Sequence, residues 1–274
     1  MDNTKGNCLG YTTLYLALAE RLSLPLFAVT LPYHVFVRYG DGVYQKDIEC
    51  TNGRDFFSLE YILNLRNMKT FTKESLQYQV ATKKEMIGYM LINRGSSKGE
   101  RKDFDGAIAD CTKAIEITSN YALAYYNRGT AKRRKGDNDG AIMDCTKAIE
   151  IKPDCAEAYH ERGISRINVN NLDEAINDFS KAIEIVPSGS TAYYNRGIAK
   201  NKKGDIDGEI ADYTKAIEIR PDYAEAYYGR GFIKGKKGDY DGALKDWEQA
   251  IRLNPSYEKE LRPAIEKAKQ AKEK

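Results

Sequence analysis

Three residues near the start of the chain have the types that thiol catalysis requires. Cys8 stands at the expected start of a helix, His34 begins an expected strand, and Glu49 ends the next strand. A helix N-terminus and a neighbouring imidazolium both stabilise a thiolate, and a carboxylate can hold the imidazole in the required tautomer. An unassisted thiol, with a pKa of about 8.5, is only slightly ionised at neutral pH. The pattern therefore predicts a nucleophile, a base and an orienting acid.

The elements that must position these side chains lie in residues 1–68. Apolar residues recur at helical spacing in residues 8–23, which predicts a helix. Residues 26–31, 34–40 and 42–50 have the composition of short strands and are separated by PY and GDG turns. A further helix is expected from Ser58 to Met68, and residues 69–87 are expected to connect this part to the next. A helix followed by antiparallel strands predicts a small α+β module.

These segments resemble the transglutaminase-like superfamily, which is related to papain-like cysteine enzymes. The resemblance rests on GNCLGYTTLYLALAERLSLPL, PYHVFVRY and IECTNG, within residues 5–55. It implies that Cys8 is the nucleophile, His34 the base and Glu49 the orienting acid, with Glu where the family usually has Asp. Free cysteine is commonly buried, so the alternative that Cys8 is a small packed residue in a retained scaffold stays open.

The rest of the chain is periodic. Glycines of the tripeptides NRG, ERG and GRG recur at one constant interval, at Gly95, Gly129, Gly163, Gly197 and Gly231. The same period carries alanines at Ala114, Ala148, Ala182, Ala216 and Ala250, and prolines at Pro153, Pro187, Pro221 and Pro255. A sustained period of about 34 residues predicts stacked supersecondary units that bury their apolar faces against one another.

Each unit has the pattern of two helices joined by a tight turn. Glycines stand where a left-handed residue would end the first helix, at Gly136, Gly204 and Gly238. Aspartates stand where the second helix needs an N-cap, at Asp105, Asp139, Asp173, Asp207 and Asp241. Capping boxes are expected at the start of two first helices, at Asp154 with Glu157 and at Asp222 with Glu225.

Charged and sulfur-containing residues also follow the period. An arginine recurs with an aspartate, which predicts a repeated structural salt bridge between Arg94, Arg128, Arg162, Arg196, Arg230 and Asp110, Asp144, Asp178, Asp212, Asp246. Cys111 and Cys145 align with Phe179, Tyr213 and Trp247, so we expect them in the core. Glu209 stands where other repeats carry alanine. A buried unpaired carboxylate is costly, so Glu209 is expected to reach solvent or a cation and to leave its repeat locally loose.

This pattern resembles the tetratricopeptide repeat, whose unit has about 34 residues, with small residues at these sites and a proline near its end. The resemblance implies a mostly α fold, a right-handed α-solenoid whose concave groove is lined by the first helices. The five repeats are expected at residues 88–121, 122–155, 156–189, 190–223 and 224–257. A capping helix and tail follow at 258–274, and the transglutaminase-like module precedes the array.

By analogy with that family, the fifth and sixth positions of each first helix face the groove. In this chain they give a tyrosine ladder with interleaved polar residues: Tyr126, Asn127, His160, Tyr194, Asn195 and Tyr228. Rings provide contact area at low entropic cost and amides bond to an extended backbone, so a peptide ligand is expected. The family's clamp for the carboxylate-ended tails of chaperones needs cations where Glu157 and Glu161 stand. The clamp is therefore not expected.

Composition narrows the function classes further. The chain has 43 basic and 40 acidic side chains, a net charge of +3, which predicts no strong field for nucleic acid or membrane. Apolar runs fall short of the roughly 20 residues of a membrane span. The start lacks the pattern of a secretory signal, and five cysteines without regular pairing favour a reducing compartment. Cys50 and Cys155 lack partners at metal-ligand spacing. A cytoplasmic protein without metal or cofactor is expected.

Three functions remain compatible with these patterns. The favoured one is an interaction scaffold that binds an extended peptide in the groove and should survive Cys8→Ser. The alternative is a cysteine hydrolase or acyltransferase that uses the array to recruit substrate, and it should be lost equally in Cys8→Ser and His34→Ala. The third is an assembly scaffold without a groove ligand, which should survive alanine at Tyr126, Tyr194 and Tyr228.

Overall fold

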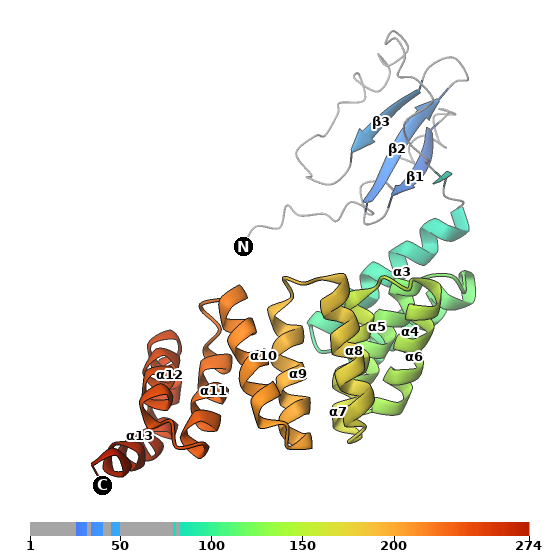
Figure 1. Cartoon of the computed structure of the whole chain (residues 1–274). Helices are drawn as coiled ribbons and strands as arrows, with labels where there is room; N and C mark the ends of the chain where they lie inside the picture. Colours follow the sequence, from blue (N-terminus) through green and yellow to red (C-terminus); the bar gives the residue numbers. More distant parts are fainter. Residues whose placement is uncertain (1–25, 32–33, 41–44, 50–78, 81–82, 274) are drawn as a thin grey trace. The chain divides into compact units, whose positions relative to one another are not determined.

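The computed structural model describes residues 26–31, 34–40, 45–49, 79–80 and 83–273 of the chain, with side chains from residue 87 onward (Figure 1). The chain divides into two compact units, Met1–Asn120 and Tyr121–Lys274.

The first unit contains a four-stranded antiparallel sheet with the strand order β3-β2-β1-β4. Its strands are β1 (Leu26–Leu31), β2 (His34–Gly40), β3 (Gln45–Glu49) and β4 (Gln79–Val80). The first three lie within the segments that the sequence predicts as strands. The fourth lies in the expected connector and was not predicted. The helices expected at residues 8–23 and 58–68 fall outside the described residues.

The first helix pair also belongs to this unit. Helix α3 (Lys83–Glu100) packs against α4 (Phe104–Ile117). Ile92 on α3 and Cys111 on α4 are almost fully buried. The pair matches the first expected repeat, although α3 begins before the expected start at position 88.

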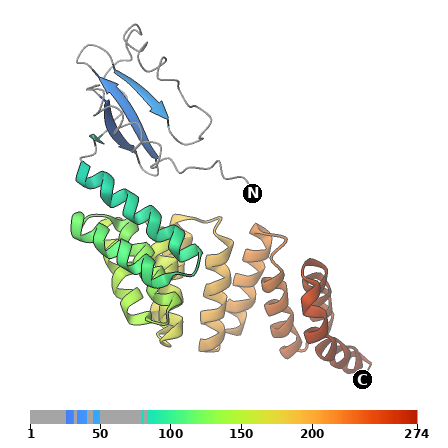
Figure 2. The same ribbon diagram turned by 180° about the vertical axis from the view of Figure 1, so that it is seen from behind.

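The second unit consists of four further helix pairs and a terminal helix (Figures 1 and 2). The pairs are α5 (Ala122–Arg134) with α6 (Asn138–Ile151), α7 (Ala156–Asn168) with α8 (Leu172–Ile185), α9 (Ser190–Lys203) with α10 (Ile206–Ile219), and α11 (Ala224–Lys236) with α12 (Tyr240–Leu253). A short turn of 3-10 helix, η2 (Pro255–Tyr257), leads into α13 (Glu258–Lys272). The expected five helix pairs and capping helix are confirmed; the handedness of the solenoid stays a prediction.

The turn between the two helices of a pair needs a left-handed residue. Gly136, Gly204 and Gly238 have φ values of +94°, +85° and +84°, as the sequence predicts. In the other two repeats the same role falls to Lys102 and Asn170, with φ values of 65° and 60°. Asparagine tolerates this region better than most residues with a Cβ.

The N-caps of the second helices differ from the prediction. Asp103, Asp137, Asp205 and Asp239 accept a hydrogen bond from the backbone amide of the glycine three residues later, and Asn171 holds the equivalent place in the third repeat without a capping bond. The predicted aspartates, Asp105, Asp139, Asp173, Asp207 and Asp241, lie within the first turn instead. Each second helix starts earlier than predicted, because the residue that follows the left-handed position already has the backbone conformation of an N-cap.

The two predicted capping boxes are also wrong. The N-caps of α7 and α11 are Cys155 and Tyr223, and neither helix has a side-chain capping bond. Asp154 and Asp222 each stand one residue too early to cap.

The core between the helices of a pair depends on a glycine facing a large side chain. A Cβ added to Gly163 would lie 2.8 Å from the ring of Phe179, which is fully buried. Cys111 and Cys145 occupy the corresponding places in the first two repeats and are also fully buried, as expected. Burial raises the pKa of the Cys145 thiol to about 12, so it behaves as a small apolar residue.

The second unit is curved over its first three helix pairs. Helix α5 contacts α7, and α7 contacts α9, whereas the second helices of these pairs contact one another more sparsely. An array whose first helices approach one another more closely than its second helices curves with the first helices on the inner side. The sides of α5, α7 and α9 that face one another therefore lie toward the inside of the curve.

Candidate functional site

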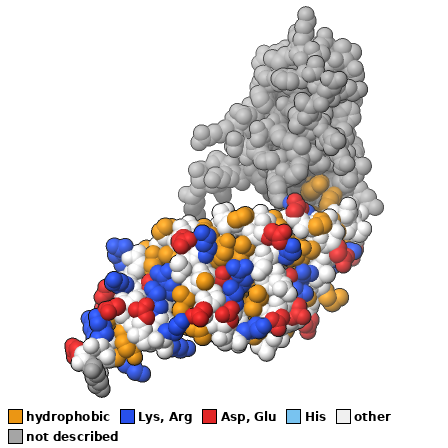
Figure 3. All heavy atoms as spheres, viewed as in Figure 1, with side chains coloured by type: hydrophobic (Ala, Val, Ile, Leu, Met, Phe, Trp, Pro, Cys, Tyr) orange, Lys and Arg blue, Asp and Glu red, His pale blue; other side chains and the backbone are white. Residues whose placement is uncertain are grey.

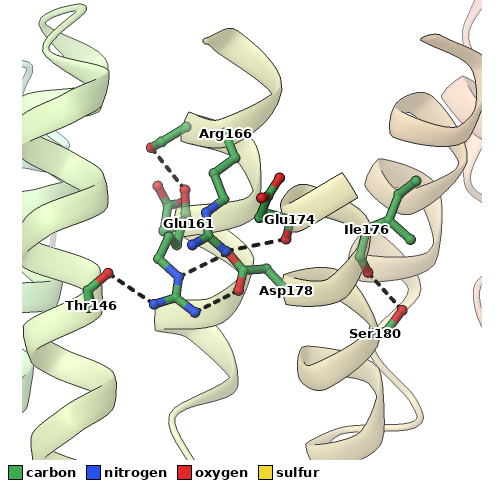
Figure 4. A network of polar contacts seen from close by, with 9 residues as sticks. Thr146, Glu161, Arg166, Glu174, Ile176, Asp178 and Ser180 are labelled. Atoms are coloured by element: carbon green, nitrogen blue, oxygen red, sulfur yellow. Dashed lines mark hydrogen bonds and ion pairs between the residues drawn. The ribbon is translucent and has the colours of Figure 1, made fainter. Parts of the chain in front are cut away.

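A buried charge cluster in each repeat fixes the first helix against the second. In the third repeat, Arg162 donates from Nε to Asp178 Oδ2 at 3.0 Å and from Nη2 to Oδ1 at 2.7 Å. Arg166 donates to the same carboxylate at 2.6 Å, and Arg162 Nη1 donates to Thr146 Oγ1 of the preceding repeat at 3.0 Å (Figure 4). This cluster, here called the Asp178 clamp, ties α7 to both α8 and α6.

The same geometry recurs along the array and confirms the predicted repeated salt bridge. The bidentate pairs are Arg94–Asp110, Arg128–Asp144, Arg162–Asp178, Arg196–Asp212 and Arg230–Asp246. A second cation, one helical turn later, binds each carboxylate: Lys98, Lys132, Arg166, Lys200 and Lys234. These residues hold together the packed helices, which are called the frame below, and we assign no ligand to these residues.

A second set of polar contacts links consecutive repeats at one edge of the array. Lys203 bonds to Asp173, Lys237 to Asp207 and Lys272 to Asp241, while Asn168 donates to Asn138, each asparagine standing one position earlier in its repeat. This set was not predicted. The signal was present as an aspartate followed by a lysine nearly one repeat later, but the aspartates were assigned to N-caps.

Glu209 behaves differently from its prediction. Its side chain does not reach solvent, since the residue is 2% exposed. Asn201 donates to Glu209 Oε2 at 2.7 Å, and no ion pair to Glu209 is present among the described residues. Burial raises the pKa of the Glu209 carboxyl, whereas bonds from Asn201 and the Tyr213 hydroxyl, followed by the charge of Lys236, lower it. The carboxylate is therefore accommodated chiefly by neutral polar groups inside repeat four; whether that repeat is loose stays a prediction.

Two of the predicted groove residues bond to each other. Asn195 Nδ2 on α9 lies 2.9 Å from His160 Nε2 on α7. Burial lowers the pKa of His160, which favours the neutral ring that can accept this bond. One repeat earlier, Arg133 Nε on α5 donates to Glu161 Oε2 on α7 at 2.7 Å. Polar side chains therefore bridge α5, α7 and α9 across their facing sides.

Tyr126 and Asn127 occupy the start of this face on α5. Burial, followed by the nearby Glu161 carboxylate, raises the pKa of Tyr126 to about 12. Both residues are partly exposed. Asn127 has no hydrogen-bond partner within the described part of the chain, so its amide remains available.

Tyr194 and Tyr228 are packed into junctions between repeats. The Tyr194 ring lies 5.4 Å from Tyr213 and 5.0 Å from Tyr223, measured between ring centroids. The Tyr228 ring lies 5.0 Å from Tyr257, and its hydroxyl donates to Glu260 Oε1 on α13 at 2.6 Å. Their pKa values are raised to about 12, chiefly by burial. The predicted ladder is thus half engaged within the array itself.

The residues on which this geometry converges are called the inner face below. They are Tyr126, Asn127, His160, Glu161, Tyr194, Asn195 and Tyr228.

The predicted thiol site lies mostly outside the described residues. Cys8 is not among them. In the sheet, Phe36 is the register partner of Glu49, and His34 precedes Phe36 by two residues in the same strand. Directly paired residues, and residues two apart in a strand, share a face of a sheet. The backbone therefore places His34 and Glu49 on the same face, and their catalytic roles stay predictions.

Charges of both signs are mixed over the surface of the second unit on the side shown in Figure 3. Within the described residues, no group of three or more His, Cys, Asp or Glu is placed to hold a metal ion. None of the helices seen in that part of the chain combines the length and apolar content needed to cross a bilayer.

Comparison with known proteins identifies the repeats. A family model described as tetratricopeptide repeat matches residues 122–155 and 224–257, and one described as TPR repeat matches residues 169–204 and 199–238. No curated protein matches the chain. These family matches lie within residues 122–257, so they do not support the transglutaminase-like resemblance of residues 5–55.

Solved structures agree in fold. A crystal structure of MamA is 28% identical, covers 60% of this chain and 96% of its own, and superposes with a TM-score of 0.55. MamA from Desulfovibrio magneticus RS-1 is 19% identical, with coverages of 64% and 97% and a TM-score of 0.57. YrrB, titled a TPR protein with an unusual peptide-binding site, is 22% identical, with coverages of 60% and 85% and a TM-score of 0.51. Residues 122–155 and 169–257 are therefore tetratricopeptide repeats, and the solved structures show the same fold.

Proposed function

We propose that the second unit is a protein-interaction module that binds an extended segment of another protein along its inner face. The observation that carries the proposal is that the polar residues divide into two structural groups. The buried clamps and the edge contacts hold the frame. On the inner face, by contrast, the amide of Asn127 has no partner among the described residues, and the ring of its neighbour Tyr126 is only partly buried.

The amides suit an extended backbone. Each asparagine amide offers two N–H donors and a carbonyl acceptor. Asn127 uses none of these within the described residues, and the bond of Asn195 to His160 engages its amide nitrogen. Two such amides, at the same position of alternate repeats, can bond to donors and acceptors of a peptide that crosses the first helices.

The charges oppose capture of a carboxylate terminus. Glu157 is exposed, and Glu161 is the acidic partner of Arg133. Both stand where the chaperone-tail clamp of this family would need cations. The proposed ligand is therefore an internal extended segment rather than an acidic chain end.

Selection of short random peptides against the full chain tests the proposal. The affinity of a selected peptide is then measured for wild type, Asn127→Ala and Asn195→Ala. Each substitution should weaken binding by about two- to tenfold, the value of one hydrogen bond. Met143→Ala is the matched control, because Met143 is 72% exposed on the second helix α6. Failure to select any peptide, or equal affinity for all four proteins, would refute the proposal.

A further inference from the structure

The residues before α7, α9, α11 and the terminal helix α13 show where the inner face is incomplete. These N-cap residues are Cys155, Gly189, Tyr223 and Tyr257, in that order. The first helix of the second unit, α5, has an aromatic N-cap, Tyr121. Each stands at the same interval along the chain from the fifth position of the preceding first helix. The array therefore has rings at its last two junctions and none at the two before them.

Where the ring is present, it closes the junction in a fixed way. Tyr194 with Tyr223, and Tyr228 with Tyr257, both have centroids 5.0 Å apart and planes at 41°. The repetition of one geometry at two junctions indicates a packing arrangement that this fold favours. Aromatic pairs at such separations attract each other beyond the area that they bury.

The junction after Tyr126 has the same tyrosine but lacks its partner ring. Tyr126 corresponds to Tyr194, and Cys155 corresponds to Tyr223. By repeat equivalence, a cysteine stands in the register position where Tyr223 contacts the ring of Tyr194. A ring-sized side chain placed at this point would reproduce the geometry of the later junctions.

The large exposed apolar residues of the second unit all belong to the same two repeats, on different elements, and Leu123 is the one on the helix that carries Tyr126. They are Leu123, Met143, Val169 and Val186, in repeats two and three. Leu123 is 44% exposed and precedes Tyr126 by three residues on α5, so the two share a helix face. The repeats that lack the partner rings are thus also those that leave apolar surface uncovered.

Charges of both signs lie beside this junction, since burial and then Glu157 raise the pKa of the Cys155 thiol, whereas Lys152 lowers it. Glu157 is exposed, and the Cys155 thiol donates to its Oε2 at 3.6 Å. No cation pairs with Glu157 among the residues that the structure describes. A basic residue next to the inserted ring would be complementary to it.

We propose that Leu123, Tyr126, Cys155 and Glu157 form an aromatic slot, which receives an aromatic side chain of the bound segment with a basic residue beside it. The proposal rests on the proposed function and names the chemistry of the ligand. The incoming ring packs against Tyr126 in the tilted arrangement in which Tyr223 packs against Tyr194.

Disulfide exchange at Cys155 tests the slot without a peptide. The full chain is equilibrated with benzyl and cyclohexylmethyl disulfides of 2-mercaptoethanol, and the modified fraction of Cys155 is read by mass spectrometry. The two probes have similar volume, and the attacking thiolate forms the same bond with both, releasing 2-mercaptoethanol. The benzyl adduct should be favoured by about two- to tenfold. Tyr126→Leu, checked for retained helicity, should remove this preference.

Equal occupancy by the two probes in wild type, or a benzyl preference that persists in Tyr126→Leu, would overturn the proposal. Either result can occur while selected peptides still bind, so it is separate from a failure of the proposed function. With a selected peptide, Cys155→Tyr should supply the missing ring and lower affinity at least tenfold, whereas Cys155→Ser should not. Dimerisation of the chain that Cys155→Tyr abolishes would assign the slot to a second copy and overturn the proposal.

Discussion

Replacement of Asp178 by alanine should destabilise the third repeat strongly. The Asp178 side chain is 3% exposed and accepts bonds from Arg162 and Arg166, whose side chains are 13% and 19% exposed. Removal of the carboxylate leaves two guanidinium groups with little access to water and no anion between them. Breaking a buried ion pair from one side costs about 3–5 kcal/mol of unfolding free energy.

Glu184→Ala is the matched control on the same helix. Glu184 pairs with Lys181 at 2.6 Å, but their side chains are 67% and 56% exposed. An exposed pair contributes about 0–1 kcal/mol because water and salt screen it. The two substitutions remove the same charge from α8 and differ chiefly in burial.

Native-state hydrogen exchange of α7 and α8 is the appropriate assay, because repeat arrays can unfold in parts. The opening free energy of these helices should fall by several kcal/mol in Asp178→Ala and stay near that of wild type in Glu184→Ala. If Asp178→Ala lowers the opening free energy of α7 and α8 by less than about 1 kcal/mol, the view that the clamps hold the frame is refuted.

Three further predictions concern single sites. Burial raises the folded pKa of Glu209, so its contribution to stability is present below the ordinary carboxyl pKa of about 4.3 and is lost as pH rises through the raised value. In Glu209→Gln, the free energy of unfolding measured in urea should no longer show this decline with pH. Parallel pH profiles for wild type and Glu209→Gln would contradict the assignment. Gly163→Ala should lower the melting temperature, because its clash with Phe179, about 1–3 kcal/mol, exceeds about 1 kcal/mol of gained helix propensity; an unchanged temperature would show that the ring moves aside. Cys8→Ser should bind selected peptides with wild-type affinity, and weaker binding would link the first unit to recognition.

The helix pairs were predictable because the constant period repeats one packing solution. A glycine such as Gly163 and a large residue such as Phe179 recur in register, so several weak signals add up. The left-handed turn at Gly204 follows from the same register. These features depend on residues close in sequence, and the same residue types recur in each repeat.

The N-caps were not predictable with equal certainty because each turn offers two candidates. In the second repeat, Asp137 and Asp139 both have the required side chain, and only the backbone of the turn decides between them. The environment of Glu209 was not predictable from its own position, because it depends on a neighbouring helix. Asn201, on that first helix, accommodates the carboxylate inside the repeat.

Contacts between repeats were the least predictable part of the candidate site. The bond between His160 and Asn195 depends on how closely α7 approaches α9, which no local pattern specifies. The same holds for Arg133 and Glu161. The absence of a ring at Cys155 is visible in the sequence, but its meaning emerges only from the tilted packing of Tyr194 and Tyr223.

Hydrogen exchange of the full chain with and without a selected peptide tests the central claim most directly. Binding along the inner face should slow exchange in the first helices α5, α7 and α9 more than in the second helices α6, α8 and α10. Protection centred on the second helices, or spread evenly over both sets, would contradict the claim that the inner face of the tetratricopeptide array binds an extended segment.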